Sequence, residues 1–330
     1  MRAVGAEFGA DSEGPSSIGT ANIPRSAMSR LDTYIAANSP FTPLLGATRT
    51  VIALALLLTL LFTPTDQVFF RSEAIPSGVI CATSGSKYSL FCFASEMGTL
   101  EAARWIAIAL LAIVASGVLP AITAIPHWYV TWSFMSTSTA VDGGDHLAAN
   151  LTLLLIPLAL LDRRIWHWKR DTSYHKQSPW IAYTAYGALG LWIAQVMGVY
   201  FQATIAKFAV LEWSDGTALW YWMQNPTFGP PGLLGDAILG TLQFLPLSIA
   251  ATYGTLLLQL TLTFAAFYTY RFRMVYLLLA VLFHVAIATT MGLWSFSLIM
   301  MAADLLFLLR PHESNRWPET GHIGSFGRAS

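Results

Sequence analysis

The sequence has few charged residues: only 11% of its 330 residues are Asp, Glu, Lys or Arg, against about 25% in soluble globular chains. Hydrophobic residues make up 55% of the chain, and the formal net charge is zero. This balance of charge gives no indication of nucleic-acid binding. We therefore expect a protein that lies in a lipid membrane and has no nucleic-acid partner.

Cysteine is almost absent, since the sequence contains only Cys81 and Cys92. Two cysteines exclude a disulfide-scaffold protein but permit one bridge. The sequence also has no Walker A motif and no zinc-binding or haem-attachment spacing, so we predict no metal site. Residues 1–45 lack the apolar core of a secretory signal. We expect residues 1–45 to form a disordered tail and residues 311–330 a second polar tail.

Long apolar runs, by contrast, fill most of the chain between these tails. A membrane-spanning helix needs about 20 mostly apolar residues. Clear candidates are the runs 51–62, 105–124, 147–161, 181–198, 249–267, 274–288 and 296–309. Many of the 12 Trp and 12 Tyr residues lie where these runs end, as interfacial anchors do. The sequence therefore predicts an all-α, polytopic transmembrane bundle over residues 46–310.

Basic residues predict the orientation of this bundle, because short cytoplasmic loops carry an excess of Lys and Arg. Five of them lie between two apolar runs: Arg163, Arg164, Lys169, Arg170 and Lys176. Arg residues also precede the first run and follow the last, so both termini are expected in the cytoplasm. An even number of spans must then precede the basic loop, which makes the more polar run 125–140 a span and gives about eight. The alternative is six spans, with 125–140 and one later segment re-entrant.

Eight spans place the loops 65–100 and 211–236 outside the cell. The first loop contains Cys81 and Cys92, which an oxidising compartment joins in a disulfide. We expect this bridge to be a structural staple that closes the loop. The alternative is a redox-active pair that oxidises a client thiol, although the two residues lack Cys-x-x-Cys spacing.

A polar stretch, from Asp142 to His146, begins the run 147–161. Asp145 is expected to cap this helix, since carboxylates stabilise the positive end of a helix. Capping does not account for His146, which is a candidate hydrogen-bond donor or proton carrier. Asn150 lies one turn later on the same helix face.

Lys207 is the most informative single residue, because it lies at the outer end of a span. One interpretation is a lysine that extends its ammonium group to the membrane interface. The other is a lysine in a partly dry pocket, where desolvation favours the neutral amine and lets it act as a base.

Four further polar residues lie within or beside apolar runs. His284 is a functional candidate by its position inside a span, although a neutral histidine bonded to a neighbouring helix is the simpler interpretation. Asp304 is similar in the last span. Gln259 and Gln243 are candidates for hydrogen bonds between helices.

Several short elements along residues 45–309 together resemble one known family. They are Leu61-Phe-Thr-Pro-Thr, Ser89-Leu-Phe-Cys92, Asp142-Gly-Gly-Asp-His-Leu, the block 200–216 and the block 283–308. In this order they resemble the SdpB family of bacterial antimicrobial-peptide system proteins, which have an HTTM domain and are related to the vitamin K-dependent gamma-carboxylase. The resemblance implies a bacterial plasma-membrane protein. It also implies two partners, a peptide-toxin precursor and a small protein of the same system.

The likeness to the carboxylase implies roles for two residues. Lys207 resembles the catalytic lysine of that enzyme, and His146 resembles a histidine that starts one of its membrane helices. The enzyme uses a reduced quinone as cofactor, so a quinone is possible here as well. The sequence departs from its relatives at Gln259, where they often have a glutamate.

Three functions follow from these observations. The first is a membrane factor for maturation or export of a secreted antimicrobial peptide, and we expect this one. The second is a quinone-dependent enzyme that modifies the peptide with Lys207 and His146. A transporter or immunity protein is the third, and a transporter needs a continuous polar path that the scattered polar residues do not indicate. Whether the chain is an enzyme stays open.

Overall fold

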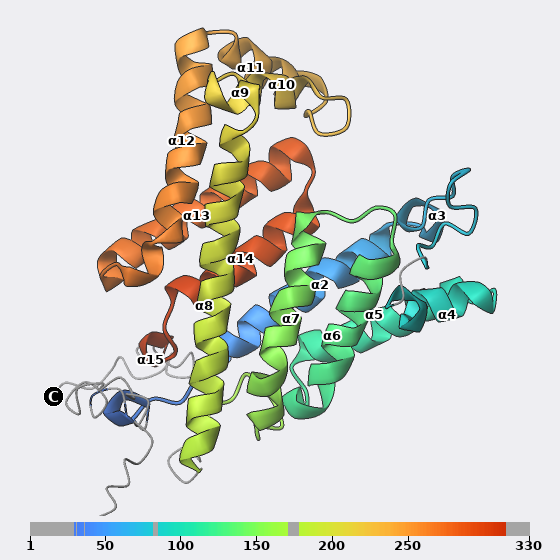
Figure 1. Cartoon of the computed structure of the whole chain (residues 1–330), viewed down its shortest axis with the longest axis vertical. Coiled ribbons are helices and arrows are strands. Elements are labelled where there is room, and N and C mark those ends of the chain that lie inside the picture. The colour runs from blue at the N-terminus through green and yellow to red at the C-terminus, as the bar shows by residue number, and fades with distance from the viewer. Residues whose placement is uncertain (1–29, 31, 36, 82–84, 171–177, 315–330) are drawn as a thin grey trace, which may run out of the picture.

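The computed structural model describes residues 30, 32–35, 37–81, 85–170 and 178–314. The predicted tails therefore lie largely outside the described residues. The described chain is all-α (Figure 1). Its main helices are α2 (Pro43–Phe62), α5 (Leu100–Ser116), α6 (Pro120–Thr137), α7 (Gly143–Leu161), α8 (Pro179–Phe208), α12 (Leu245–Thr263), α13 (Tyr270–Met291) and α14 (Trp294–Leu308). Shorter helices are α3 (Thr65–Val68), α4 (Leu90–Glu96), α9 (Leu211–Ser214), α10 (Ala218–Gln224), α11 (Gly232–Leu242) and α15 (Pro311–Ser314), and two 3-10 turns, η1 (Ser86–Tyr88) and η3 (Ala265–Phe267), complete them.

Five helices are long and apolar enough to cross a membrane: α2, α7, α8, α12 and α13. The helices α11 and α14 are apolar but shorter. The prediction of an all-α fold is thus confirmed, and the five candidate spans support a multi-pass membrane protein. The count of eight spans stays a prediction, because α5, α6 and α14 do not meet the same standard of length and apolarity.

The turns between the eight main helices gather at two ends of the bundle. At one end Arg164 of the basic loop bonds to Thr42, before α2, and the His167 amide donates to Gly117, between α5 and α6. At the other end, Arg104 near the start of α5 donates to the carbonyls that end α2. We call these the basic end and the disulfide end. Successive main helices alternate in direction between them (Figure 1).

The boundary between the runs 105–124 and 125–140 lies earlier than the sequence indicates. Helix α5 stops at Ser116 because Gly117 adopts a left-handed conformation with φ 84°. Leu119 is also left-handed, at φ 46°, and Pro120 then begins α6, a position where its missing N–H costs nothing. An added Cβ at Gly117 would lie 2.4 Å from the His167 ring. The apolar run is thus interrupted by a turn that hydropathy does not reveal.

Helix α8 is longer than its predicted run 181–198. Its 30 residues extend about 45 Å at 1.5 Å per residue, which exceeds the hydrocarbon thickness of about 30 Å. Its C-terminal end therefore carries α9, α10 and α11 away from the rest of the bundle (Figure 1). The predicted loop 211–236 contains the first two of these helices and the start of the third.

The hydrophobic core has two main parts. One part joins residues of α2, α7, α8 and α14, and it already includes Ile35 and Phe41, which precede α2. The other part joins α2, α5 and α6 with the segment that carries the cysteines. Helix α2 belongs to both parts and thereby holds the two halves of the bundle together.

Candidate functional site

Three polar side chains meet deep inside the bundle, each from a different helix. The Tyr200 hydroxyl of α8 donates to both carboxylate oxygens of Asp304 in α14, at 2.9 Å each. The same hydroxyl lies 3.1 Å from Nε2 of His284 in α13. Each of the three side chains is at most 1% exposed. This buried triad links α8, α13 and α14 at one level of the bundle.

The hydrogen bonds of the triad define where the protons lie. A phenol hydroxyl carries a single proton, and Tyr200 donates it to Asp304. With the hydroxyl donating to Asp304, the contact with His284 fits the tautomer that carries its proton on Nε2, an atom that also lies 3.5 Å from Asp304 Oδ2. The other ring nitrogen, Nδ1, has no partner among the described residues, so the neutral tautomer leaves only a lone pair unsatisfied there. His284 is thus bonded to a neighbouring helix, in line with the simpler of its two interpretations.

The sequence pattern indicates His284 and Asp304 as polar candidates but not Tyr200. A tyrosine within an apolar run more often packs its ring in the core or at an interface than serves as a hydrogen-bonding group. The sequence does contain one signal of this buried site: His284 and Asp304 lie in adjacent apolar runs, and buried charges are paired or hydrogen-bonded. A third helix had to supply the hydroxyl that satisfies both.

The start of α7 forms a capping box in which Asp142, and not Asp145, is the N-cap. The Asp142 Oδ1 atom accepts from the amides of Gly144 and Asp145 at 2.7 and 3.2 Å. The Asp145 Oδ2 atom accepts from the Asp142 amide at 3.0 Å. This reciprocal pair satisfies donors that a helix end leaves open. Both carboxylates therefore serve the helix end.

His146 and Asn150 lie on the exposed face of α7. No hydrogen bond or ion pair of the described residues involves either side chain. Gln259 in α12 is 7% exposed, and its Oε1 atom has no partner in the described part of the chain. Gln243 is exposed just after α11. None of these four side chains contacts the buried triad through a hydrogen bond.

Lys207 lies at the C-terminal end of α8, half-buried. Its ammonium group donates to the Ala203 carbonyl at 3.2 Å, one turn earlier in the same helix. The same group lies 5.3 Å from the ring centroid of Trp213, within cation–π distance. Among the described residues, no carboxylate pairs with Lys207.

Beyond Trp213 the chain forms a pocket of about 280 Å³. Its lining includes Glu212, Trp213, Tyr221, Trp222 and Asn225. These residues come from α9, α10 and the turn after α10. We call this the aromatic pocket. Its lining residues follow the C-terminal end of α8, where α9, α10 and α11 extend away from the rest of the bundle (Figure 1).

The structure does not bring Lys207 and His146 into contact: no hydrogen bond, ion pair or ring contact joins them within the described residues. A quinone site built on these two residues is therefore not assembled here. The aromatic pocket also falls just below the volume range of about 300–1,000 Å³ for small-molecule sites. Within the described residues, Lys207 and His146 thus form no shared site for the implied quinone.

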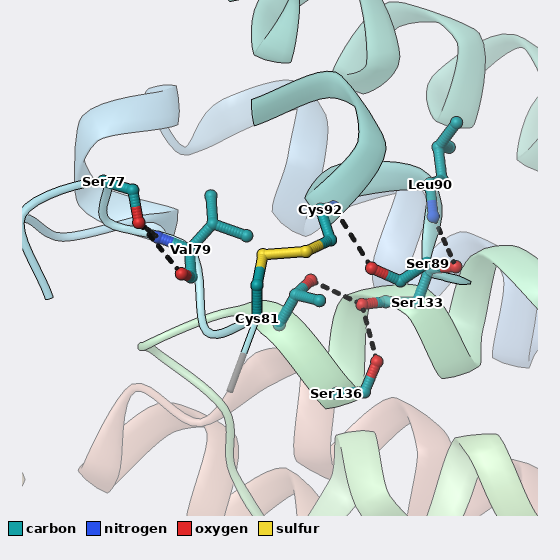
Figure 2. Close-up of a disulfide and its surroundings, with 9 residues drawn as sticks. Ser77, Val79, Cys81, Ser89, Leu90, Cys92, Ser133 and Ser136 are labelled. Atoms are coloured by element: carbon teal, nitrogen blue, oxygen red, sulfur yellow. Dashed lines mark hydrogen bonds between the residues drawn. A yellow bond between two sulfur atoms is a disulfide. The ribbon is translucent and has the colours of Figure 1, made fainter. Parts of the chain in front are cut away.

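The structure contains a disulfide between Cys81 and Cys92, whose Cα atoms lie 5.8 Å apart (Figure 2). Cys92 is fully buried on α4, and Cys81 lies in the preceding loop, half-buried. The Ser133 hydroxyl of α6 accepts from the Leu90 amide at 3.2 Å. The bridge ties Cys81 to α4, and the Ser133 contact holds the start of α4 against α6.

The basic end is closed by residues 162–169 of the basic loop. Arg164 donates to the Asp162 carboxylate at 2.7 and 2.8 Å and to the His167 and Lys169 carbonyls at 2.7 Å. The His167 ring packs against Gly117, where no side chain fits. Burial, reinforced by the charges of Arg49 and Arg164, lowers the pKa of His167 to about 4. This loop segment is thus a packed part of the bundle.

Two proteins of Bacillus subtilis (strain 168) are similar to the chain over most of its length. The uncharacterized protein YitO is 35% identical over 273 residues, which cover 82% of this chain and 86% of YitO. The sporulation-delaying protein SdpB is 29% identical over 293 residues, which cover 87% of each chain. No protein-family model and no solved structure matches the chain. On the strength of these alignments, the chain belongs to the family of YitO and SdpB.

Proposed function

We propose that this chain is a membrane factor for the maturation or export of a secreted antimicrobial peptide. Its partners in this role are the peptide precursor and a small protein of the same system. The observation that carries the proposal is the similarity to SdpB over 87% of both chains. The alignment is too long to reflect one shared motif, and it covers most of a bundle whose core is continuous through α2.

We place the protein in the bacterial plasma membrane on an HTTM-like scaffold of eight spans, with both termini in the cytoplasm. The alternation of the eight main helices supports an even number of crossings. The positive-inside rule puts the basic end, with Arg163 and Arg164, in the cytoplasm. The disulfide then lies outside, where disulfides persist.

Deletion of the gene tests the proposed function. We expect the mature peptide to disappear from the medium while the precursor accumulates in the cells. Mass spectrometry of medium and cell extract separates these two species. Expression of the protein from a plasmid must restore the mature peptide. Unchanged secretion of active peptide in the deletion strain contradicts the proposal.

A peptide-modifying enzyme is the second candidate, and the position of Lys207 favours it. Its ammonium group is half-buried and has a backbone carbonyl and a ring as its partners among the described residues. Burial therefore favours the neutral amine, and no ion pair offsets this effect. The Lys207→Ala variant should then abolish a mass change in the secreted peptide beyond cleavage and disulfide formation. Lys87 is a matched control, because it is exposed and lies 4.9 Å from the Tyr88 ring.

The two candidates give different results in this experiment. If Lys207→Ala still yields active peptide of normal mass at a normal protein level, the enzyme is excluded and the maturation or export role stands. If Lys207→Ala and Lys87→Ala lower the yield equally, neither lysine has a specific role. A quinone could supply oxidative base chemistry only at a site that joins Lys207 and His146, so we derive no step through it.

A further inference from the structure

The aromatic pocket has the size and lining of a site for a single side chain. Its volume is about 280 Å³, which is small for a cofactor. Three aromatic residues line it: Trp213 is 9% exposed, while Tyr221 and Trp222 are 58% and 37% exposed. Aromatic faces attract cations through the negative face of the ring. Lys207 already uses the Trp213 ring in this way, at 5.3 Å.

The charge of the surrounding segment also favours a cation. Lys207 is the one cation that adjoins the pocket within the described contacts, and residues 208–270 contain no Lys, Arg or His but have three carboxylates, Glu212, Asp215 and Asp236. Asp215 is engaged, because its Oδ1 atom accepts from the amide and hydroxyl of Thr217 at 2.9 and 2.6 Å. Glu212 lines the pocket, and its carboxylate has no hydrogen bond or ion pair within the described part of the chain. A half-buried carboxylate beside aromatic rings is complementary to an ammonium or guanidinium group.

We propose that the aromatic pocket binds a lysine or arginine side chain of the peptide client. Glu212 pairs with the charged group, and Tyr221 and Trp222 enclose its aliphatic stem. The pocket follows the C-terminal end of α8, which lies on the outer side in the proposed orientation, where a secreted peptide arrives. This inference rests on the proposed function for the identity of the ligand, but the preference for a cation rests on the pocket alone.

The test uses the full-length protein in nanodiscs of phosphatidylglycerol, which has no amine in its headgroup. Three dye-labelled tripeptides serve as probes: acetyl-Ala-Lys-Ala-amide, its arginine analogue and its glutamine analogue. We expect the lysine and arginine peptides to bind, and the neutral glutamine peptide to bind at least about tenfold more weakly. Glu212→Gln should weaken binding of the lysine peptide by about tenfold. Trp222→Leu should also weaken it, whereas Trp222→Phe retains an aromatic face and most of the affinity.

Asp236→Asn is the matched control, because it removes one exposed carboxylate from the same segment outside the pocket. We expect its affinity for the lysine peptide to stay within about twofold of the unchanged protein. Equal losses in Glu212→Gln and Asp236→Asn would mean that general surface charge attracts the peptide, which overturns the pocket. Equal affinity for the lysine and glutamine peptides overturns it as well.

A second arm distinguishes a peptide from a lipid headgroup. The same titrations are repeated in nanodiscs that contain phosphatidylethanolamine, which carries an ammonium group. If this lipid abolishes binding of the lysine peptide, the headgroup is the ligand and the peptide assignment is wrong. Retained peptide affinity supports the assignment. Failure here leaves the proposed function intact, because that function is decided by peptide secretion in the deletion strain.

Discussion

The hydroxyl of Tyr200 donates to Asp304 across the interface of α8 and α14, and neither side chain is more than 1% exposed. His284 completes the contact from α13. A carboxyl group is costly in an apolar interior unless it is hydrogen-bonded. The Tyr200 hydroxyl therefore stabilises both buried side chains, because it contacts Asp304 and His284 at once.

Replacement of Tyr200 by Phe should destabilise the protein. The change removes the hydroxyl that bonds to Asp304 and His284, at a cost of about 1–3 kcal/mol. Thermal unfolding of the purified protein in detergent measures the loss. Tyr253→Phe is the matched control, because the Tyr253 hydroxyl also donates a hydrogen bond, to the Ser214 carbonyl, but is exposed. Equal unfolding temperatures for the two variants would contradict the role of the triad.

Arg164 should be far more important to stability than its neighbour Arg163. Arg164→Gln leaves the buried Asp162 carboxylate without its ion pair, which costs about 3–5 kcal/mol. Arg163 is exposed, so Arg163→Gln should change the free energy of unfolding by no more than about 0.5 kcal/mol. Both variants remove one positive charge from the same loop. The comparison fails to support the packed loop if both unfold at the same temperature.

His167 should make the stability of the basic end depend on pH. Its pKa is about 4 in the folded protein and about 6.5 in an unfolded chain. A depressed histidine pKa means that stability is full above pH about 6.5 and falls as the pH is lowered toward 4. The loss should reach about 1–3 kcal/mol. His167→Gln removes this contribution, so the difference in unfolding temperature between protein and variant should shrink on acidification; a constant difference would contradict the assignment.

The disulfide should stabilise the segment 85–96, which contains η1 and α4. Cys81 and Cys92 are 11 residues apart, and closing a loop of this length is worth about 3 kcal/mol in the chain-entropy account. The double variant Cys81→Ser, Cys92→Ser should therefore lose protection of the segment 85–96 against proteolysis. A client-oxidising pair predicts a different result, in which peptide disulfide formation fails while the protein keeps its stability.

The sequence was sufficient to predict the helices but not all of their ends. Apolar composition finds α2, α7 and α13 because their lengths are set by the thickness of a membrane. It does not find the turn at Gly117, where a close approach of the His167 ring excludes a side chain. That contact joins residues 50 positions apart, so no local pattern encodes it.

The polar residues show the same division between local and distant information. That a carboxylate caps the start of α7 was predictable, since spacing along one helix determines capping, although the N-cap is Asp142 and not Asp145. The partner of His284 and Asp304 was not, because Tyr200 lies more than 80 positions before His284. The surroundings of Lys207 divide in the same way: Trp213, only six positions later, lies near its ammonium group, whereas the distant His146 does not contact it.

The most direct test of the account is the accessibility of Cys81 in living cells. In the Cys92→Ser variant, the half-buried Cys81 thiol is free and is the only cysteine of the chain. We predict that a membrane-impermeant maleimide labels this thiol in intact cells, because the disulfide end faces outward. Labelling only after the membrane is permeabilised would place this end in the cytoplasm and contradict the proposed orientation.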